Sequence, residues 1–277
     1  MGEAPANAFA RAAAGAGFDV VEFRVERVEE YLAAGGSTSE LREEVETGNK
    51  TRVASLNALE DFSLAGSAKF KREVLPAAER MAELTYKLEG DLVVAVPSFL
   101  PGSGEGRGVE WGAVVEKTRQ RLVELSKVCS KYDVNVGFEF LGFPTCSVRT
   151  IEQAAEVLAP LYHDKRENLG LVVDTFHYAV GGSESALNRR DESLLLVHVN
   201  DLPESFSGRL EEARDEDRVL PGEGFLDLEG ILSGVAGRVP LSVELFDEEL
   251  AKRPPGEVAT ECFRALDGLR RRLDHVE

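Results

Sequence analysis

Short runs rich in β-branched residues alternate with longer helical patterns along the whole chain, and this alternation restricts the fold more than any other feature. Consecutive parallel strands need a crossover connection, usually a helix, so the pattern predicts a parallel α/β architecture. The predicted strands are 19–24, 52–59, 91–99, 134–141, 169–176, 194–201 and 239–246. The predicted helices are 5–16, 38–48, 66–89, 110–132, 150–164, 183–190, 226–236 and 254–273.

The length of 277 residues suits one (β/α)8 TIM-type barrel, a fold of about 250 residues, so we expect residues 1–277 to form a single barrel domain. Such a barrel needs eight strands, yet seven are predicted and the chain opens on a helical segment. The regular order therefore predicts a barrel that lacks its first β-strand. Either the barrel is open at that point, or residues 1–4 and a neighbour fill it, or the natural chain begins further upstream.

An open doubly wound sheet is the alternative architecture, and it would place its site where the strand order reverses. A dinucleotide-binding fingerprint would favour that fold, but the glycine-rich stretch "GSGEGRG" at 102–108 does not match GxGxxG. A flexible loop or lid that follows a strand is the better interpretation of this stretch.

Charge and cysteine usage exclude several classes of function. The formal net charge is −18, from 50 acidic and 32 basic residues, so the surface repels phosphate backbones and anionic membranes, and no nucleic-acid partner is expected. Three widely spaced cysteines form no CxxC pair, which indicates a reducing compartment. No signal peptide is recognisable, and no apolar stretch approaches the roughly 20 residues of a membrane span, so we expect a cytoplasmic protein without a membrane partner.

Each of the last four predicted strands carries one metal-ligand type of side chain near its C-terminal end. Side chains two apart share a face of a strand, so Asp174 points the same way as Val172. In a parallel barrel the C-terminal ends of all strands meet at one face, where the active site is built. We therefore expect four side chains to converge there: Glu139, Asp174, His198 and Glu244.

Three carboxylates that converge in a cavity cannot all stay ionised without a counter-charge. A divalent cation resolves this conflict, and three carboxylates with one imidazole suit Mn²⁺, Mg²⁺, Co²⁺ or Zn²⁺. A single acidic residue at a strand end is more often a helix cap or an ion-pair partner. Four such residues in four consecutive strands make the metal site the better interpretation.

Two further residues are candidates for substrate contact. His177 falls just beyond its strand, and it could instead be a loop histidine tied to a backbone carbonyl. Arg218 lies in "DEDRVLPGEG", a predicted loop over the barrel mouth, where an arginine can clamp a hydroxyl or orient a carboxylate. A surface arginine among acidic neighbours is the equal alternative.

Several stretches together resemble one known family. "VGFEFLGFPTCSVRTIEQAAEVL", "NLGLVVDTFHYAVGG", "VHVNDLPES", "EDRVLPGEGFLDL" and "SVELF" are similar to the xylose isomerase-like TIM-barrel family of sugar isomerases and epimerases. The resemblance runs from about residue 5 to the C-terminus, although members of this family possess the first strand. It implies that Glu139, Asp174, His198 and Glu244 bind one divalent metal ion and that His177 and Arg218 face the substrate.

Two glutamates on opposite sides of one metal suggest proton transfer next to a carbonyl group. The metal would bind the ketone oxygen and the neighbouring hydroxyl and stabilise the charge of an enediolate. Glu244 would act as the base and Glu139 as the acid, with the reverse assignment open. The expected function is a divalent-metal-dependent isomerase or epimerase of a keto-polyol or keto-sugar.

Other functions stay open. A dehydratase (lyase) would use the same metal and base to expel water from a keto-inositol or a dehydroshikimate-type substrate. A catalytically inactive barrel would keep the pocket as a ligand-binding site. The DNA endonuclease branch of the same barrel needs several metals and more histidines than the four in this chain, which disfavours it. The sequence does not give the oligomeric state, and a homodimer is allowed.

Overall fold

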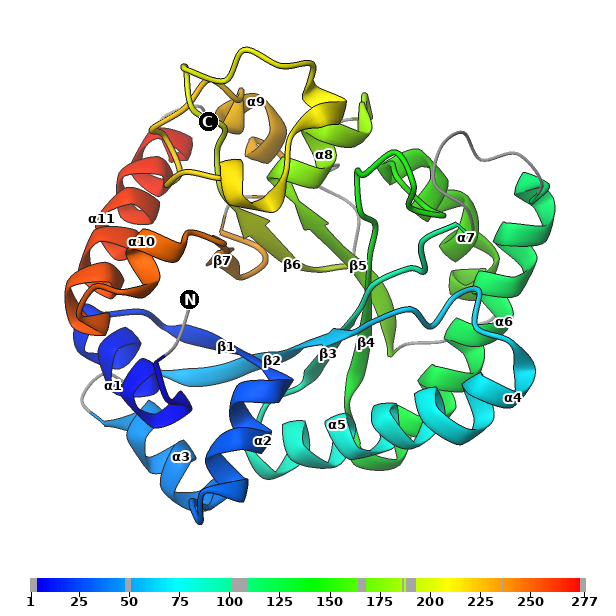
Figure 1. Cartoon of the computed structure of the whole chain (residues 1–277), viewed down its shortest axis with the longest axis horizontal. Helices are drawn as coiled ribbons and strands as arrows, with labels where there is room; N and C mark the ends of the chain where they lie inside the picture. Colours follow the sequence, from blue (N-terminus) through cyan, green and yellow to red (C-terminus); the bar gives the residue numbers. More distant parts are fainter. Residues whose placement is uncertain are drawn as a thin grey trace.

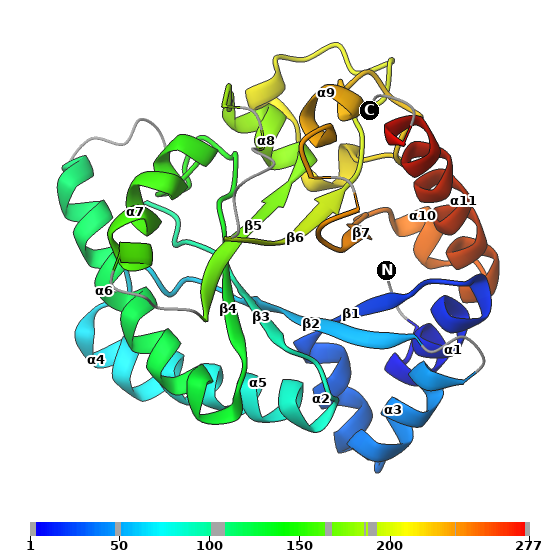
Figure 2. The same cartoon turned by 180° about the vertical axis from the view of Figure 1, so that it is seen from behind.

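Seven strands of the described chain form one parallel sheet, and their order in the sheet is their order in the sequence. The computed structural model describes residues 4–47, 51–100, 109–163, 168–185, 187, 193–235 and 237–274. The strands are β1 (Val20–Arg24), β2 (Arg52–Leu59), β3 (Leu92–Ala95), β4 (Asn135–Glu139), β5 (Leu169–Asp174), β6 (Leu194–Val199) and β7 (Leu241–Val243). The sheet is curled with helices around its outside (Figures 1 and 2), so the predicted TIM-type barrel is confirmed as a nearly closed barrel.

Helices connect the strands and cover the outer face of the sheet. The longer ones are α1 (Ala6–Ala16), α2 (Val25–Ala33), α3 (Thr38–Glu46), α5 (Leu75–Lys87), α6 (Trp111–Cys129), α7 (Ile151–His163), α8 (Thr175–Gly181) and α11 (Pro255–Leu273). The short ones are α4 (Ser67–Lys69), the π-helical η1 (Phe70–Val74), η2 (Ser130–Tyr132), η3 (Leu210–Glu212), η4 (Asp215–Asp217), α9 (Leu228–Leu232) and α10 (Glu248–Ala251). Over the part of the chain that the structure describes, no helix combines the length and apolar character needed to cross a membrane.

Two apolar layers hold the barrel together. The outer layer lies between the strands and the helices, and its largest fully buried side chains include Phe23, Phe62, Phe70 and Phe138. A smaller inner cluster contains Val172 and Leu196. These residues lie two positions before Asp174 and His198 on the same strand faces, so the inner cluster is the floor beneath the polar strand ends.

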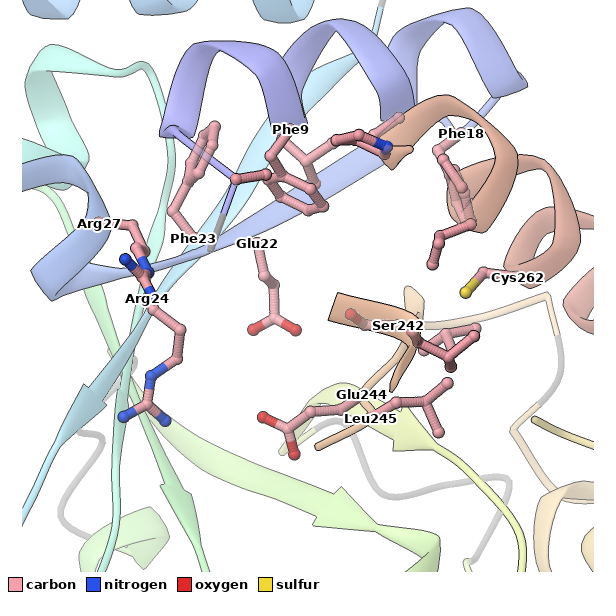
Figure 3. Close-up of a pocket in the computed structure, with 18 of the residues that line it drawn as sticks. Phe9, Phe18, Glu22, Phe23, Arg24, Arg27, Ser242, Glu244, Leu245 and Cys262 are labelled. Atoms are coloured by element: carbon pink, nitrogen blue, oxygen red, sulfur yellow. The ribbon is translucent and has the colours of Figure 1, made fainter. Parts of the chain in front are cut away.

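The two ends of the sheet meet at an open junction. β1 and β7 are the end strands, and no ladder joins them within the described residues. No described strand precedes α1, as the sequence predicted. We call the pocket between β1 and β7 the seam. Side chains of α1 and α11, among them Phe9 and Cys262, line it together with Glu22 and Glu244 (Figure 3).

The connection after β5 differs from the prediction. Asp174 ends the strand, and its Oδ1 accepts a hydrogen bond of 2.9 Å from the backbone N–H of His177, which makes it the N-cap of α8. Gly182 ends this helix in the left-handed conformation, with φ of 75°. The predicted helix 183–190 is therefore wrong over 183–185 and 187. Residues 186 and 188–190, like the predicted loop at 102–108, lie outside the described residues.

Candidate metal centre

The C-terminal ends of four neighbouring strands bring the four predicted ligand side chains together. Glu139 and Asp174 are the last residues of β4 and β5, His198 is the last but one of β6, and Glu244 directly follows β7. One possible ligand atom of each lies within 4.8 Å of the others. Three of the residues are buried, while the Glu244 side chain keeps 18% of its surface exposed.

The imidazole of His198 has a different neighbour on each of its two nitrogens. Nδ1 lies 2.9 Å from Glu139 Oε1 and 3.7 Å from Glu244 Oε2. Nε2 lies 3.0 Å from Glu22 Oε1, although it is not aligned with that oxygen as in a hydrogen bond. The nitrogen that faces the cluster of carboxylates is therefore Nδ1.

Glu22 is a member of the site that the sequence reasoning missed. It lies in the middle of β1, where its carboxylate accepts a hydrogen bond from Ser55 Oγ of the neighbouring strand β2. Val21 and Phe23 on either side of it are buried in the outer layer. The signal was available, because an acidic residue between two outward-facing apolar residues must point into the barrel.

Arg218 is buried at the centre of the polar network, so its interpretation as a surface arginine is wrong. Its Nη1 donates to Asp174 Oδ2 at 3.1 Å and to Glu244 Oε2 at 2.8 Å. Its Nη2 donates to Asp215 Oδ1 at 2.7 Å and lies 3.2 Å from His177 Nε2. One guanidinium thus links two predicted metal ligands to a predicted substrate residue.

His177 is buried in the first turn of α8 and does not lie in a loop. An arginine can only donate, so the contact with Arg218 makes His177 Nε2 the acceptor and leaves the ring proton on Nδ1. Among the described residues no group hydrogen-bonds this Nδ1. Burial, and then Arg218, lower the pKa of His177 well below its usual value, which agrees with a neutral ring.

Two asparagines, which the sequence analysis did not single out, hydrogen-bond to the carboxylates of Glu244 and Asp174. Asn57 Nδ2 donates to Glu244 Oε1 at 3.0 Å, and Asn200 Nδ2 donates to Asp174 Oδ2 at 2.9 Å. Asn200 shares the inward face of its strand with His198, so strand parity could have found it. These amides fix the orientation of the two carboxylates.

The electrostatics of the cluster show a shortage of positive charge. Burial raises the pKa of Glu139 to about 7 and also raises the pKa of Asp174. Burial opposes ionisation of Glu244 as well, but His198 and Arg218 lower its pKa to about 2. Burial lowers the pKa of His198, yet Glu22, Glu139 and Glu244 outweigh it and raise that pKa well above the usual value.

The donor set fits a divalent cation. Three carboxylate oxygens and one imidazole nitrogen gather within 4.8 Å, and this combination suits Mn²⁺, Mg²⁺, Co²⁺ or Zn²⁺. Such an ion would replace the proton of His198 as the counter-charge of the carboxylates, and it would favour the ionised form of Glu139.

Known proteins share this sequence pattern. A family model described as xylose isomerase-like TIM barrel matches residues 10–268. Inosose isomerase of Bacillus velezensis is 33% identical over 242 residues, which cover 85% of this chain and 81% of the relative. Inosose isomerase of Bacillus subtilis is 33% identical over 246 residues, with 85% of this chain and 82% of the relative covered.

Solved structures share the fold. The crystal structure of the IOLI protein with a binding zinc atom has a TM-score of 0.84 at 27% identity, and the match covers 98% of this chain and 94% of that chain. D-Psicose 3-epimerase from Clostridium cellulolyticum H10, solved with D-tagatose, has a TM-score of 0.68 at 16% identity, with 98% and 94% covered. The second likeness concerns the fold alone.

Proposed function

We propose that this chain is a divalent-metal-dependent isomerase or epimerase of keto-polyols, with a keto-inositol as its substrate. The chain belongs to the xylose isomerase-like TIM barrel family and is an enzyme of the isomerase class. The observation that carries the proposal is the convergence of four ligand atoms within 4.8 Å at the C-terminal end of the barrel. The inosose isomerases to which the chain is similar support the substrate class.

Glu139, Asp174, His198 and Glu244 would hold the cation. When bound, it would supply positive charge next to a carbonyl oxygen and make the neighbouring C–H bond more acidic. Asp174 and His198 come from the two middle strands of the four, whereas Glu139 and Glu244 come from the outer two, β4 and β7. The two glutamates therefore reach the site from different sides, which suits proton removal from one side and proton return from the other.

We assign Glu244 as the base and Glu139 as the acid. Glu244 is the partly exposed member of the set and lines the seam pocket, so its carboxylate has access to a ligand (Figure 3). Asn57 and Arg218 each donate to one of its two oxygens and thereby hold it in one orientation. Glu139 is buried and would return the proton on the other side. The reverse assignment is the alternative.

His177 and Arg218 would contact substrate oxygens. The Nδ1 proton of His177 is a buried donor without an acceptor among the described residues, and a buried donor of that kind costs free energy until a ligand accepts from it. Arg218 holds Asp174 and Glu244 and shares a contact with His177, so it would connect substrate binding to the base.

Incubation of the Mn²⁺-loaded protein with a keto-inositol in D₂O tests the proposal. We expect an isomeric product that carries solvent deuterium on one carbon, since proton removal and return exchange that hydrogen. Chelator-treated protein should give no reaction. A product lighter by one water would show a dehydratase instead, and tight binding without deuterium exchange would show a binding protein.

A further inference from the structure

Glu22 faces the side of the His198 ring that the candidate metal site does not use. Nδ1 of the ring points to Glu139 and Glu244, while Nε2 lies 3.0 Å from Glu22 Oε1. A neutral imidazole carries one proton, so a ring that binds a cation through Nδ1 must carry its proton on Nε2. That proton would be directed toward the side of the ring where Glu22 lies.

The carboxylate of Glu22 is itself fixed. Ser55 Oγ donates to Glu22 Oε2, and the two residues are direct partners in the ladder between β1 and β2. Ser55 is fully buried, and the Glu22 side chain is only 11% exposed. A serine on the next strand therefore holds one oxygen of Glu22 and leaves the other toward His198.

We propose that Glu22 is a positioning residue of the metal site: its carboxylate accepts the Nε2 proton of His198 and so fixes the tautomer and the ring orientation in which Nδ1 binds the cation. This inference rests on the proposed metal-dependent function. A carboxylate behind a ligating histidine also makes the ligating nitrogen more basic, and loss of such a partner typically weakens metal binding about 10–100-fold.

Direct ligation by Glu22 is the rival explanation, and the geometry disfavours it. Glu22 contacts the ring at Nε2, whereas Glu139 and Glu244 lie on the Nδ1 side. Glu22 therefore meets the ring at the nitrogen that does not face Glu139. Figure 3 shows Glu22 on β1 across the seam from Glu244.

Zinc affinity of the whole chain, measured by chelator competition, tests this role without an activity assay. We expect Glu22→Ala to bind Zn²⁺ about 10–100-fold more weakly than the unaltered protein. Glu22→Gln should lose less, because its amide oxygen can still accept the Nε2 proton. Ser55→Ala should weaken binding slightly, and Glu26→Gln, a change of an exposed glutamate on α2, is the matched control without effect.

A second measurement separates positioning from general stability. In the Zn²⁺-loaded protein, ¹⁵N NMR of the histidine ring should show a protonated Nε2 in a hydrogen bond, and Glu22→Gln should shift that proton signal, while thermal unfolding shows that the variant is still folded. The glutamine variant keeps the size of the side chain, so it serves even where Glu22→Ala does not fold.

These measurements distinguish a failure of the proposed role of Glu22 from a failure of the proposed metal-dependent function. If the unaltered protein binds no Zn²⁺, the metal-dependent function itself is wrong. If it binds Zn²⁺ and the Glu22 variants bind it equally tightly with an unchanged His198 signal, only the role of Glu22 is overturned. A loss more than about 1,000-fold in Glu22→Gln would exceed the effect of an outer partner and would make Glu22 a direct ligand.

Discussion

The two sides of the barrel hold the same cluster of candidate metal ligands in different ways. Strands β4, β5 and β6 pair with neighbours on both edges, and the side chains of Glu139, Asp174 and His198 are almost completely buried. Across the barrel, β7 has three residues, is half-buried throughout and, among the described strands, pairs on one edge only. We call these the closed side and the seam side.

The difference shows how each part of the site is positioned. On the closed side the ladder itself places the ligands, since Asp174 and His198 are direct partners across β5 and β6. On the seam side, side-chain contacts replace the missing ladder, because Asn57 and Arg218 hold Glu244. We therefore expect the closed side to dominate metal affinity and the seam side to be the more adjustable part of the catalytic machinery.

Glu244→Gln is the change with the largest expected effect on turnover. It removes the proposed base but leaves three ligands on the closed side, so turnover should fall by about 10²–10⁴-fold while the ion stays bound. Steady-state kinetics and metal content measure the two effects. Glu249→Gln, an exposed glutamate in α10, is the control. Retained activity of the Glu244→Gln variant with metal present would contradict the two-glutamate scheme.

His198→Ala is the closed-side counterpart. It removes a ligand and leaves the buried carboxylates without their cationic neighbour, so metal affinity should fall by more than the about 100-fold typical for loss of an outer partner. Isothermal titration with Zn²⁺ measures the dissociation constant of each variant. If Glu244→Gln loses as much affinity as His198→Ala, the two sides contribute equally and the comparison fails.

Gly137→Ala tests how tightly the closed side is packed. A Cβ at Gly137 would lie 2.5 Å from Val172 Cγ2 and 3.1 Å from Leu92 Cδ1, so the inner cluster would have to shift. We expect the free energy of unfolding to fall by about 1–3 kcal/mol in urea titration. Gly112→Ala in α6 is the control, because a Cβ there meets no atom within 4 Å. Unchanged stability would show a loosely packed interior.

His177→Gln should have a moderate effect that is confined to substrate binding. Gln replaces the proposed imidazole donor at an altered position, and the loss of one hydrogen bond of about 0.5–1.5 kcal/mol corresponds to a roughly 2–13-fold higher KM. Metal affinity should stay unchanged, since Asp174 and the other ligands remain. A loss of metal binding in this variant would place His177 among the ligands instead.

The smallest expected difference between the two sides is the rate at which their cysteine thiols react. Cys262 lines the seam, whereas Cys129 is the last residue of α6 and lies in the outer apolar layer. Burial raises the pKa of the Cys129 thiol to about 12 and that of the Cys262 thiol to about 11, so both should react slowly in the native protein. Mass spectrometry after alkylation should find Cys262 modified first. Earlier modification of Cys129 would show that the closed side opens more often than the seam.

Much of the barrel could be predicted because strand–helix alternation and strand parity are local properties. The alternation of side chains along a strand is enough to predict that Asp174 and His198 point into the barrel. The same rule points Glu22 inward, but Glu22 lies in the middle of β1, whereas a barrel's active site is expected at the strand ends. Helix α2 was missed because "VVEFR" continues into "VERVEEYLA" without a turn residue between strand and helix.

The position of Arg218 could not be predicted from its neighbours in sequence. Its local sequence, "DEDR", is typical of an exposed segment, and only contacts with Asp174 and Glu244 from distant strands explain its burial. The roles of the site residues, the single-domain organisation of residues 1–277, the cytoplasmic location and a homodimer stay predictions.

The N-cap of α8 sets a fixed spacing inside the site. One carboxylate, Asp174, both starts the helix through Oδ1 and belongs to the ligand cluster, so His177 is placed relative to that cluster by a single turn of backbone. Arg218, by contrast, reaches the same place from the connection after β6. Under the proposed roles, insertions and deletions in that connection would change how Arg218 meets the substrate, whereas the spacing between the candidate ligand cluster and His177 would stay constant.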